Sequence, residues 1–200
     1  TPPYGYHYTL IYRLLHHKPL PIWNYGSNVT TMMRVEDFAE NLVCLFNNPL
    51  AFNECFNISG DNYASWIEVV NFMCEKYSVI PSVVNLDIDY ILHYYPEKKG
   101  EFYVDRCSDH IVCNDKVKKI TKLKDRFTIK EGVNKTIDFY EMNNMFLGVD
   151  YEYDGKLDRM INDSGLWQDK LRFISYDKYS IKNKLSYCKG YYYDSPFLII

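Results

Sequence analysis

The sequence lacks three features, each of which would point to a particular class of protein. It contains no run of about 18 consecutive apolar residues, which argues against a membrane-spanning helix. Its net charge of −3 argues against the broad positive field of a nucleic-acid-binding domain, so no nucleic acid is expected as a partner. Its six cysteines include no C-x-x-C pair, which zinc ribbons and thiol-redox motifs require. We therefore expect no metal site, and cysteines that are buried free thiols.

The chain has 200 residues, which is enough to bury a hydrophobic core. Apolar residues make up 47% of the sequence and aromatic residues 17%, which argues against disorder over most of its length. No signal peptide is recognisable, so the default expectation is a cytoplasmic protein. The chain opens with Thr1-Pro2-Pro3 instead of Met, which favours a piece of a longer protein or a processed one.

Short apolar segments alternate with amphipathic stretches along most of the chain. The spacing of apolar residues predicts helices at 6–17, 37–48, 66–77, 87–95, 116–120 and 131–144. Apolar and β-branched runs predict strands at 20–23, 29–35, 55–58, 82–86 and 109–113. Strands separated by helices favour an α/β fold. We expect residues 1–145 to form the main domain and the Tyr-rich residues 146–200 to form an extension packed on it.

Three helix starts carry residues that suit a helix N-terminus. Ser65 with Glu68, and Thr128 with Glu131, each have the spacing of a capping box. Asp115 is expected to cap the short helix that follows it.

A series of short motifs follows in a fixed order between residues 4 and 161. In the first part of the chain they are Lys18-Pro19, Tyr25-Gly26, Arg34–Ala39, Asn48-Pro49 and Asn53–Gly60. Further along they are Asn114–Lys118, Glu131–Val133, Thr136–Tyr140 and Asp158–Ile161. In this order they resemble the C-terminal half of the NAD-dependent epimerase/dehydratase family, the extended short-chain dehydrogenases/reductases related to UDP-glucose 4-epimerase. The resemblance implies an α/β fold, in which an α+β substrate-binding half carries the last elements of a Rossmann sheet.

Two motifs of that family are missing from the chain. The family's cofactor site is a G-x-x-G-x-x-G turn between a strand and a helix, and no glycines here are close enough in sequence to form it. The family's catalytic pair is a Tyr with a Lys four residues later. Tyr95 and Lys99 match that spacing, but they fall in the substrate-binding part and we interpret them as a chance match. The resemblance thus implies that the N-terminal Rossmann half is absent, that NAD or NADP binds the intact protein, and that this chain alone holds neither a cofactor nor catalytic residues.

The resemblance places a first group of substrate-binding candidates between residues 20 and 37. Trp23 falls where relatives hold the nucleotide base, although a buried core Trp is the favoured alternative. Thr30 falls where many epimerases carry an Arg that clamps the diphosphate, and a Thr cannot replace that charge. Arg34 lies four positions further on and is a candidate substitute, with a surface or helix-capping Arg as the alternative.

A second group of candidates lies elsewhere in the chain. Asp105 and Arg106 fall where relatives bind sugar hydroxyls and phosphate, with a solvated ion pair as the alternative. His7 and Tyr8 open the first predicted helix near the expected active site, and packing at the helix start is the alternative. A basic run is interpreted as a solvated face; it consists of Lys116, Lys118, Lys119, Lys122 and Lys124.

Two functions of different classes remain open. The first is the substrate-binding portion of an NAD-dependent nucleotide-sugar epimerase or dehydratase, inactive as an isolated fragment. Its partners would be a nucleotide-sugar substrate and the missing Rossmann half. The second is a divergent, non-catalytic member of the superfamily that acts as a binding or structural module, and Thr30 favours it. Because such a half normally packs on a Rossmann domain, we also expect an exposed apolar patch and a homo-oligomer.

Overall fold

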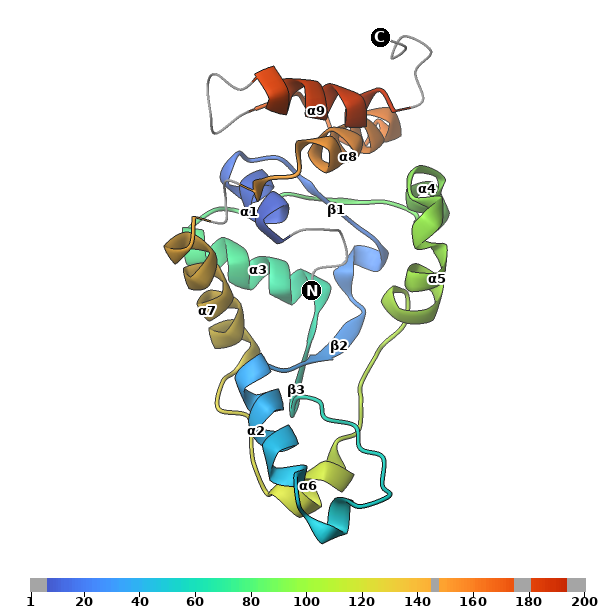
Figure 1. Cartoon of the computed structure of the whole chain (residues 1–200). Coiled ribbons are helices and arrows are strands. Elements are labelled where there is room, and N and C mark those ends of the chain that lie inside the picture. Colours follow the sequence, from blue (N-terminus) through green and yellow to red (C-terminus); the bar gives the residue numbers. More distant parts are fainter. Residues whose placement is uncertain (1–6, 145–147, 175–180, 194–200) are drawn as a thin grey trace.

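The computed structural model describes residues 7–144, 148–174 and 181–193, without the side chain of His7 (Figure 1). Helices and short strands alternate along these ranges, so the predicted α/β class is confirmed. The helices are α1 (His7–Leu15), α2 (Val35–Leu45), α3 (Trp66–Tyr77), α4 (Ile88–Tyr94), α5 (Lys99–Glu101), α6 (Asp115–Thr121), α7 (Ile129–Met142), α8 (Tyr151–Ser164) and α9 (Ile181–Tyr191). Short 3-10 turns occur at Asn24–Gly26, Pro49–Ala51 and Pro96–Lys98, and a π-helical turn at Phe102–Arg106.

Two small sheets connect the helices. β1 (Leu20–Ile22) pairs in parallel with β4 (Val83–Asn85). β2 (Val29–Met32) pairs antiparallel with β3 (Asn62–Ser65). A parallel pair needs a long crossover, and α2, β3 and α3 lie within the crossover here. The register places Leu20 opposite Val83 and Val29 opposite Ser65.

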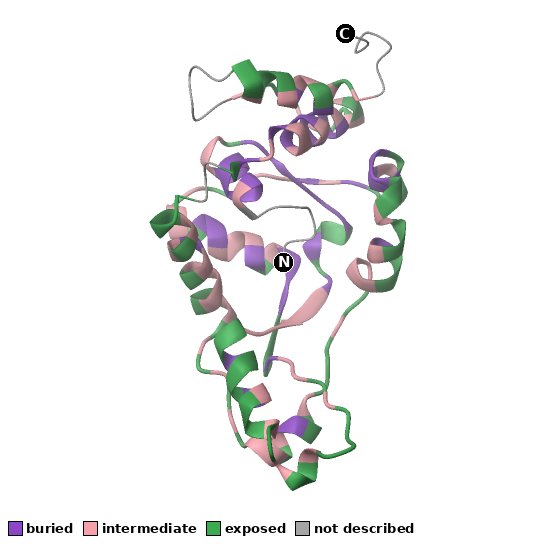
Figure 2. Ribbon diagram, viewed as in Figure 1, coloured by how far each residue is buried: buried purple, intermediate pink, exposed green. Residues whose placement is uncertain are grey.

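The elements are arranged in an elongated body. In Figure 1, α8 and α9 lie at one end, α2 and α6 lie at the other, and α1, α3, α7 and the sheets lie between them. Buried residues concentrate in α1, β1, α3 and α8, whereas α2 and α6 are mostly exposed or half-buried (Figure 2). The main core joins α1, α3, α4 and α8 through buried side chains such as Leu10, Met73, Ile91 and Leu157.

Two predicted capping boxes are present. The Ser65 hydroxyl accepts from the Glu68 backbone N–H, and the Glu68 carboxylate accepts from the Ser65 N–H at 2.8 Å. Thr128 and Glu131 form the same pair of bonds at the start of α7. Both helices line the cavity described below, so these caps fix where its walls begin.

Three local predictions need correction. The strand predicted at 55–58 is wrong, because this segment pairs with no other strand; the paired strand is β3, which begins at Asn62. The strand predicted at 109–113 reduces to one parallel bridge between His110 and Thr30. Asp115 is the first residue of α6, and the N-cap position belongs to Asn114, whose side chain instead donates to the carbonyls of residues 59 and 60.

The cysteines also differ from expectation. All six are free, as predicted, but Cys44, Cys55 and Cys113 are exposed and Cys74 is the one that is fully buried. The exposed thiols lie on α2 and on the loops beside α6, where the chain has few layers of structure to cover them. Burial raises the pKa of the Cys74 thiol to about 11, so this thiol stays protonated.

No helix in the described ranges combines the length and apolarity needed to cross a membrane. In the same ranges, no three His, Cys, Asp or Glu side chains are grouped so that they could hold a metal ion.

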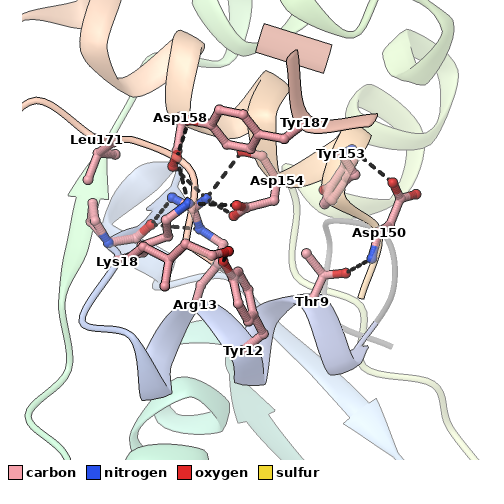
Figure 3. Close-up of polar contacts among 12 residues, drawn as sticks. Thr9, Tyr12, Arg13, Lys18, Asp150, Tyr153, Asp154, Asp158, Leu171 and Tyr187 are labelled. Atoms are coloured by element: carbon pink, nitrogen blue, oxygen red, sulfur yellow. Dashed lines mark hydrogen bonds and ion pairs between the residues drawn. The ribbon is translucent and has the colours of Figure 1, made fainter. Parts of the chain in front are cut away.

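Buried charges join α8 and α9 to the first helix (Figure 3). Arg13 Nη1 lies 2.5 Å from Asp154 Oδ1 and 2.8 Å from Asp158 Oδ1. Lys18 Nζ lies 2.6 Å from the second oxygen of each carboxylate. The Tyr187 hydroxyl donates to Asp158 at 2.8 Å. Burial raises the pKa of Asp154, while Arg13 and Lys18 act in the opposite direction. The division of the chain into two parts at residue 145 stays a prediction. Two buried cations from the first part, Arg13 and Lys18, balance the charge of two buried carboxylates from the second part, Asp154 and Asp158.

Candidate functional site

A cavity of about 780 Å³ lies between β2, α3 and α7. Volumes of roughly 300–1,000 Å³ are typical of small-molecule sites. Much of its wall is apolar and includes Met32, Val69, Met73 and Ile137. Hydroxyl, guanidinium and carboxylate groups complete the lining, in the mixture that fixes the orientation of a ligand.

β2 and the extended residues after it form one wall. Because side chains alternate along extended chain, Thr30, Met32 and Arg34 share one face, and the first and last Cα atoms are roughly 13 Å apart. Arg34 keeps extended backbone (φ −73°, ψ 146°) and α2 begins at the next residue. The wall therefore carries a hydroxyl at one end, a guanidinium at the other and a thioether between them.

Arg34 reaches from this wall to α7 and is held there. Its Nη1 donates to the Gly132 carbonyl at 3.4 Å and to Thr136 Oγ1 at 3.3 Å. Its Nε donates to Glu36 Oε2 at 2.9 Å, and its Nη2 donates to the other carboxylate oxygen. The side-chain hydrogen bond from Arg34 is the main cause that lowers the pKa of Glu36. Arg34 thus presents one guanidinium balanced by one carboxylate.

Arg106 is the second guanidinium in the cavity wall. It lies 5.3 Å from the centre of the Trp66 ring and donates to Glu101 Oε1 at 3.1 Å. Its Nε also lies 3.3 Å from Asp105 Oδ2. Burial alone would raise the pKa of Glu101, but hydrogen bonds from Lys98 and Arg106 outweigh it and the pKa is lowered. Two carboxylates therefore face this one guanidinium.

The structure brings three of the predicted site residues to one cavity: Thr30, Arg34 and Arg106 all line it. Asp105 contacts Arg106 but does not line the cavity. Tyr8 is half-buried, and its ring packs edge-on against Tyr140, a cavity residue, at 6.2 Å. The side chain of His7 lies outside the described part of the chain.

Trp23 lies in the core and not in the cavity wall. It is 1% exposed, its ring packs 4.9 Å from Phe102, and its Nε1 donates to the Arg106 carbonyl at 2.9 Å. These contacts fit the core interpretation of Trp23. They also give it an indirect role, because the same bond holds the backbone that carries Arg106.

Several cavity residues were not among the sequence-based candidates, and they include Glu36, Phe127 and Thr136. Glu36 lies two residues after Arg34, a spacing that allows the forked pair. Three cations surround the Phe127 ring, with Lys135 at 4.7 Å, Arg126 at 5.8 Å and Arg34 at 6.0 Å. No sequence pattern predicts that these cations surround Phe127, because they come from three separate segments of the chain.

Side chains already cap the two helices that follow strands β3 and β4, α3 and α4. At the strand-to-helix turn before α4, the Asp87 carboxylate accepts from the backbone N–H groups of Asp89 and Tyr90. At the turn before α3, the Ser65 hydroxyl accepts from the Glu68 N–H, and the Glu68 carboxylate accepts from the Ser65 N–H and hydroxyl. A carboxylate at a helix N-terminus occupies the position that a cofactor pyrophosphate would need and repels its charge.

No protein-family model matches the chain. Among curated proteins it is similar to the chloroplast stem-loop binding protein of 41 kDa b of Arabidopsis thaliana, with 26% identity over 134 residues, or 64% of this chain and 34% of that protein. Among solved structures it is similar to an epimerase from Methanothermobacter thermautotrophicus, with a TM-score of 0.56, 19% identity, and coverage of 69% of this chain and 38% of that one. It is also similar to dTDP-glucose 4,6-dehydratase from Bacillus anthracis, with a TM-score of 0.51, 19% identity, and coverage of 68% and 39%.

The chain has the fold of one part of these enzymes. A third structure, UDP-glucuronic acid 4-epimerase from Bacillus cereus in complex with UDP-glucuronic acid and NAD, agrees, with a TM-score of 0.51 and 15% identity over 67% of this chain. The predicted likeness to NAD-dependent epimerases and dehydratases is thereby confirmed for the fold. The matching part spans about a third of the length of the curated relative and 38% to 39% of these enzymes.

Proposed function

We propose that this chain is the substrate-binding part of an NAD-dependent epimerase or dehydratase and that its cavity binds the nucleotide portion of a nucleotide-sugar. The observation that carries the proposal is the meeting of Thr30, Arg34 and Arg106 in one cavity of about 780 Å³. The fold supports it, because one enzyme that shares the fold was solved in complex with UDP-glucuronic acid and NAD. NAD would supply the hydride chemistry in the intact enzyme, from residues outside this chain.

The cavity lining suits such a ligand. Apolar side chains such as Met73 and Ile137 would cover a base or sugar ring, and the Thr30 hydroxyl would bond to sugar or phosphate oxygens. A guanidinium matches phosphate oxygens with two parallel hydrogen bonds, and Arg34 already makes such a forked pair with the Glu36 carboxylate. This chain would bind and orient the substrate, and it would not transfer protons or hydride.

Calorimetric titration with UDP tests the proposal, and Thr30→Arg is expected to strengthen binding. The variant adds a guanidinium to the cavity wall, and a charge-assisted hydrogen bond of about 1.5 kcal/mol corresponds to about tenfold in affinity. Uridine, which lacks the phosphates, serves as the control ligand and is expected to bind the variant and the parent chain equally. The proposal fails if neither protein binds UDP, or if uridine and UDP respond alike to the substitution.

The exposed apolar side chains of α2 and the turn after it support a further part of the proposal. They are Val35, Phe38, Val43, Phe46, Leu50 and Phe52. A patch of this kind is typical of an interface. We propose that either the missing Rossmann half or a second copy of the chain covers it.

Binding of a stem-loop RNA is the second candidate function, and it gives the non-catalytic alternative a ligand. The name of the curated relative favours it. Lys119, Lys122 and Lys124 also favour it, because they are exposed and no ion pair involves them among the described residues. Lys116 and Lys118, by contrast, pair with Glu54 and Asp61. The net charge of −3 argues on the other side.

Reversing the three exposed lysines to Glu is expected to abolish retention of a stem-loop RNA in a gel-shift assay. If all three contact phosphates, the logarithm of the affinity falls with that of the salt concentration with a slope of about −2.7. The matched control is Lys116→Glu, which alters a lysine already paired with Glu54. Absence of binding by the parent chain, or retention that survives the triple reversal, rules this candidate out.

A further inference from the structure

Arg34 and Glu36 form a forked ion pair, and Arg34 has more further contacts than Glu36. The Arg34 side chain is 20% exposed and is fixed to α7 by bonds to Gly132 and Thr136. Its stem also packs closely on Gly132, where even an added Cβ would lie 3.3 Å from Arg34 Cδ. The Glu36 side chain is 45% exposed, and each of its carboxylate oxygens accepts from Arg34. If the pair opens, the carboxylate moves into solvent and the guanidinium stays.

The surrounding charges make Arg34 a better binding position for an anion than Arg106. Arg106 faces two carboxylates, Glu101 and Asp105, whereas Arg34 faces one. Arg126, which lies by the same Phe127 ring as Arg34, also acts on Glu36 and lowers its pKa. An anion that displaced Glu36 would therefore meet the freed guanidinium of Arg34 with no second carboxylate among the described residues paired to it.

We propose that Glu36 is an internal competitor for the anionic group of the ligand and that binding exchanges the Glu36 carboxylate on Arg34 for a phosphate. This inference rests on the proposed nucleotide-sugar function and names a specificity-determining residue of that site. The exchange is a replacement of one forked set of hydrogen bonds by another, and no covalent bond changes. A ligand without a phosphate cannot make the exchange, so the pair would select phosphorylated ligands over neutral ones.

Calorimetric titration of the Glu36→Gln variant with UDP tests whether the Glu36 carboxylate competes with the ligand for Arg34. The variant removes the competing charge and is expected to bind UDP about fivefold to tenfold more tightly than the parent chain. Glu40→Gln is the matched control: Glu40 lies on the same helix, is 48% exposed and pairs with Arg126 instead of Arg34. Its affinity for UDP is expected to stay within about twofold of the parent value. Uridine is expected to bind all three proteins equally.

A second substitution separates competition from a general change of charge. In an Arg34→Met background, Glu36→Gln is expected to leave the affinity for UDP unchanged, because the contested guanidinium is gone. A gain that persists in that background, or an equal gain in Glu40→Gln, overturns the inference. So does an unchanged affinity in Glu36→Gln, although UDP binding by the parent chain would then leave the proposed function intact. If no variant binds UDP, the inference and the proposed function fall together.

Discussion

Replacing Asp158 with Asn is expected to lower the free energy of unfolding by about 3–5 kcal/mol. Asp158 is fully buried and accepts from Arg13 at 2.8 Å, Lys18 at 2.6 Å and Tyr187 at 2.8 Å. Asn keeps nearly the same shape but removes one of the two negative charges. Arg13 and Lys18 would then share the single carboxylate of Asp154 in a site that water does not reach. An unbalanced buried charge costs more than a lost hydrogen bond, because its desolvation is no longer offset.

Unfolding in urea measures the effect, and a second substitution tests the reason for it. Lys18→Met in the Asp158→Asn background restores one cation to one carboxylate. The double variant is therefore expected to be less destabilised than the sum of the two single variants. Lys189→Ala is the control, because it removes the exposed Lys189–Glu152 pair from the same two helices and is expected to change little. Strictly additive losses would contradict the role given to charge balance.

The parts of the fold that depend on local patterns could be predicted from the sequence. Apolar spacing and the two capping boxes located α3 and α7, because helix periodicity and N-terminal bonds involve residues close in sequence. The strand predicted at 55–58 was wrong for the complementary reason. A short apolar run becomes a strand only when another segment offers its backbone groups, and residues 62–65 meet β2 instead.

Contacts between residues far apart in the sequence, as in the cavity and among the buried charges, could not be predicted from local patterns either. Thr30, Arg34 and Arg106 were predicted as candidates from a resemblance, but only the fold brings the last of them to the other two. The pairing of Arg13 with Asp154 and Asp158 joins residues 141 and 145 positions apart. A signal for it was present, since Arg13 interrupts the apolar face of the first helix, and Asp154 and Asp158 have the i, i+4 spacing of a shared face. A buried cation on an apolar face requires a partner, although the sequence cannot say which acid supplies it.

Replacing Gly190 with Ala is expected to separate α8 from α9. A Cβ on Gly190 would lie 1.7 Å from the Glu152 carbonyl oxygen and 2.6 Å from its carbon, and both atoms belong to backbone. Gly155 makes the reciprocal approach, with a Cβ position 2.2 Å from the Tyr187 carbonyl oxygen. Neither contact can be relieved by rotating a side chain, so the helices themselves must move. Overpacking of this kind costs about 1–3 kcal/mol, which exceeds the gain of about 1 kcal/mol that Ala brings to a helix interior.

Gly100→Ala separates this steric effect from the general consequences of adding a methyl group. No atom lies within 4 Å of a Cβ on Gly100, so that variant is expected to be unchanged or stabilised by about 0.4–1 kcal/mol. A stable Gly190→Ala variant with an intact α8–α9 pair would show that the two backbones need not approach so closely. The loss at Gly190 should also depend on the buried charges, because Tyr187 on α9 bonds to Asp158 on α8. Once the helices separate, that bond is broken as well. The double variant Gly190→Ala/Asp158→Asn is therefore expected to lose less free energy of unfolding than the two single variants lose in sum.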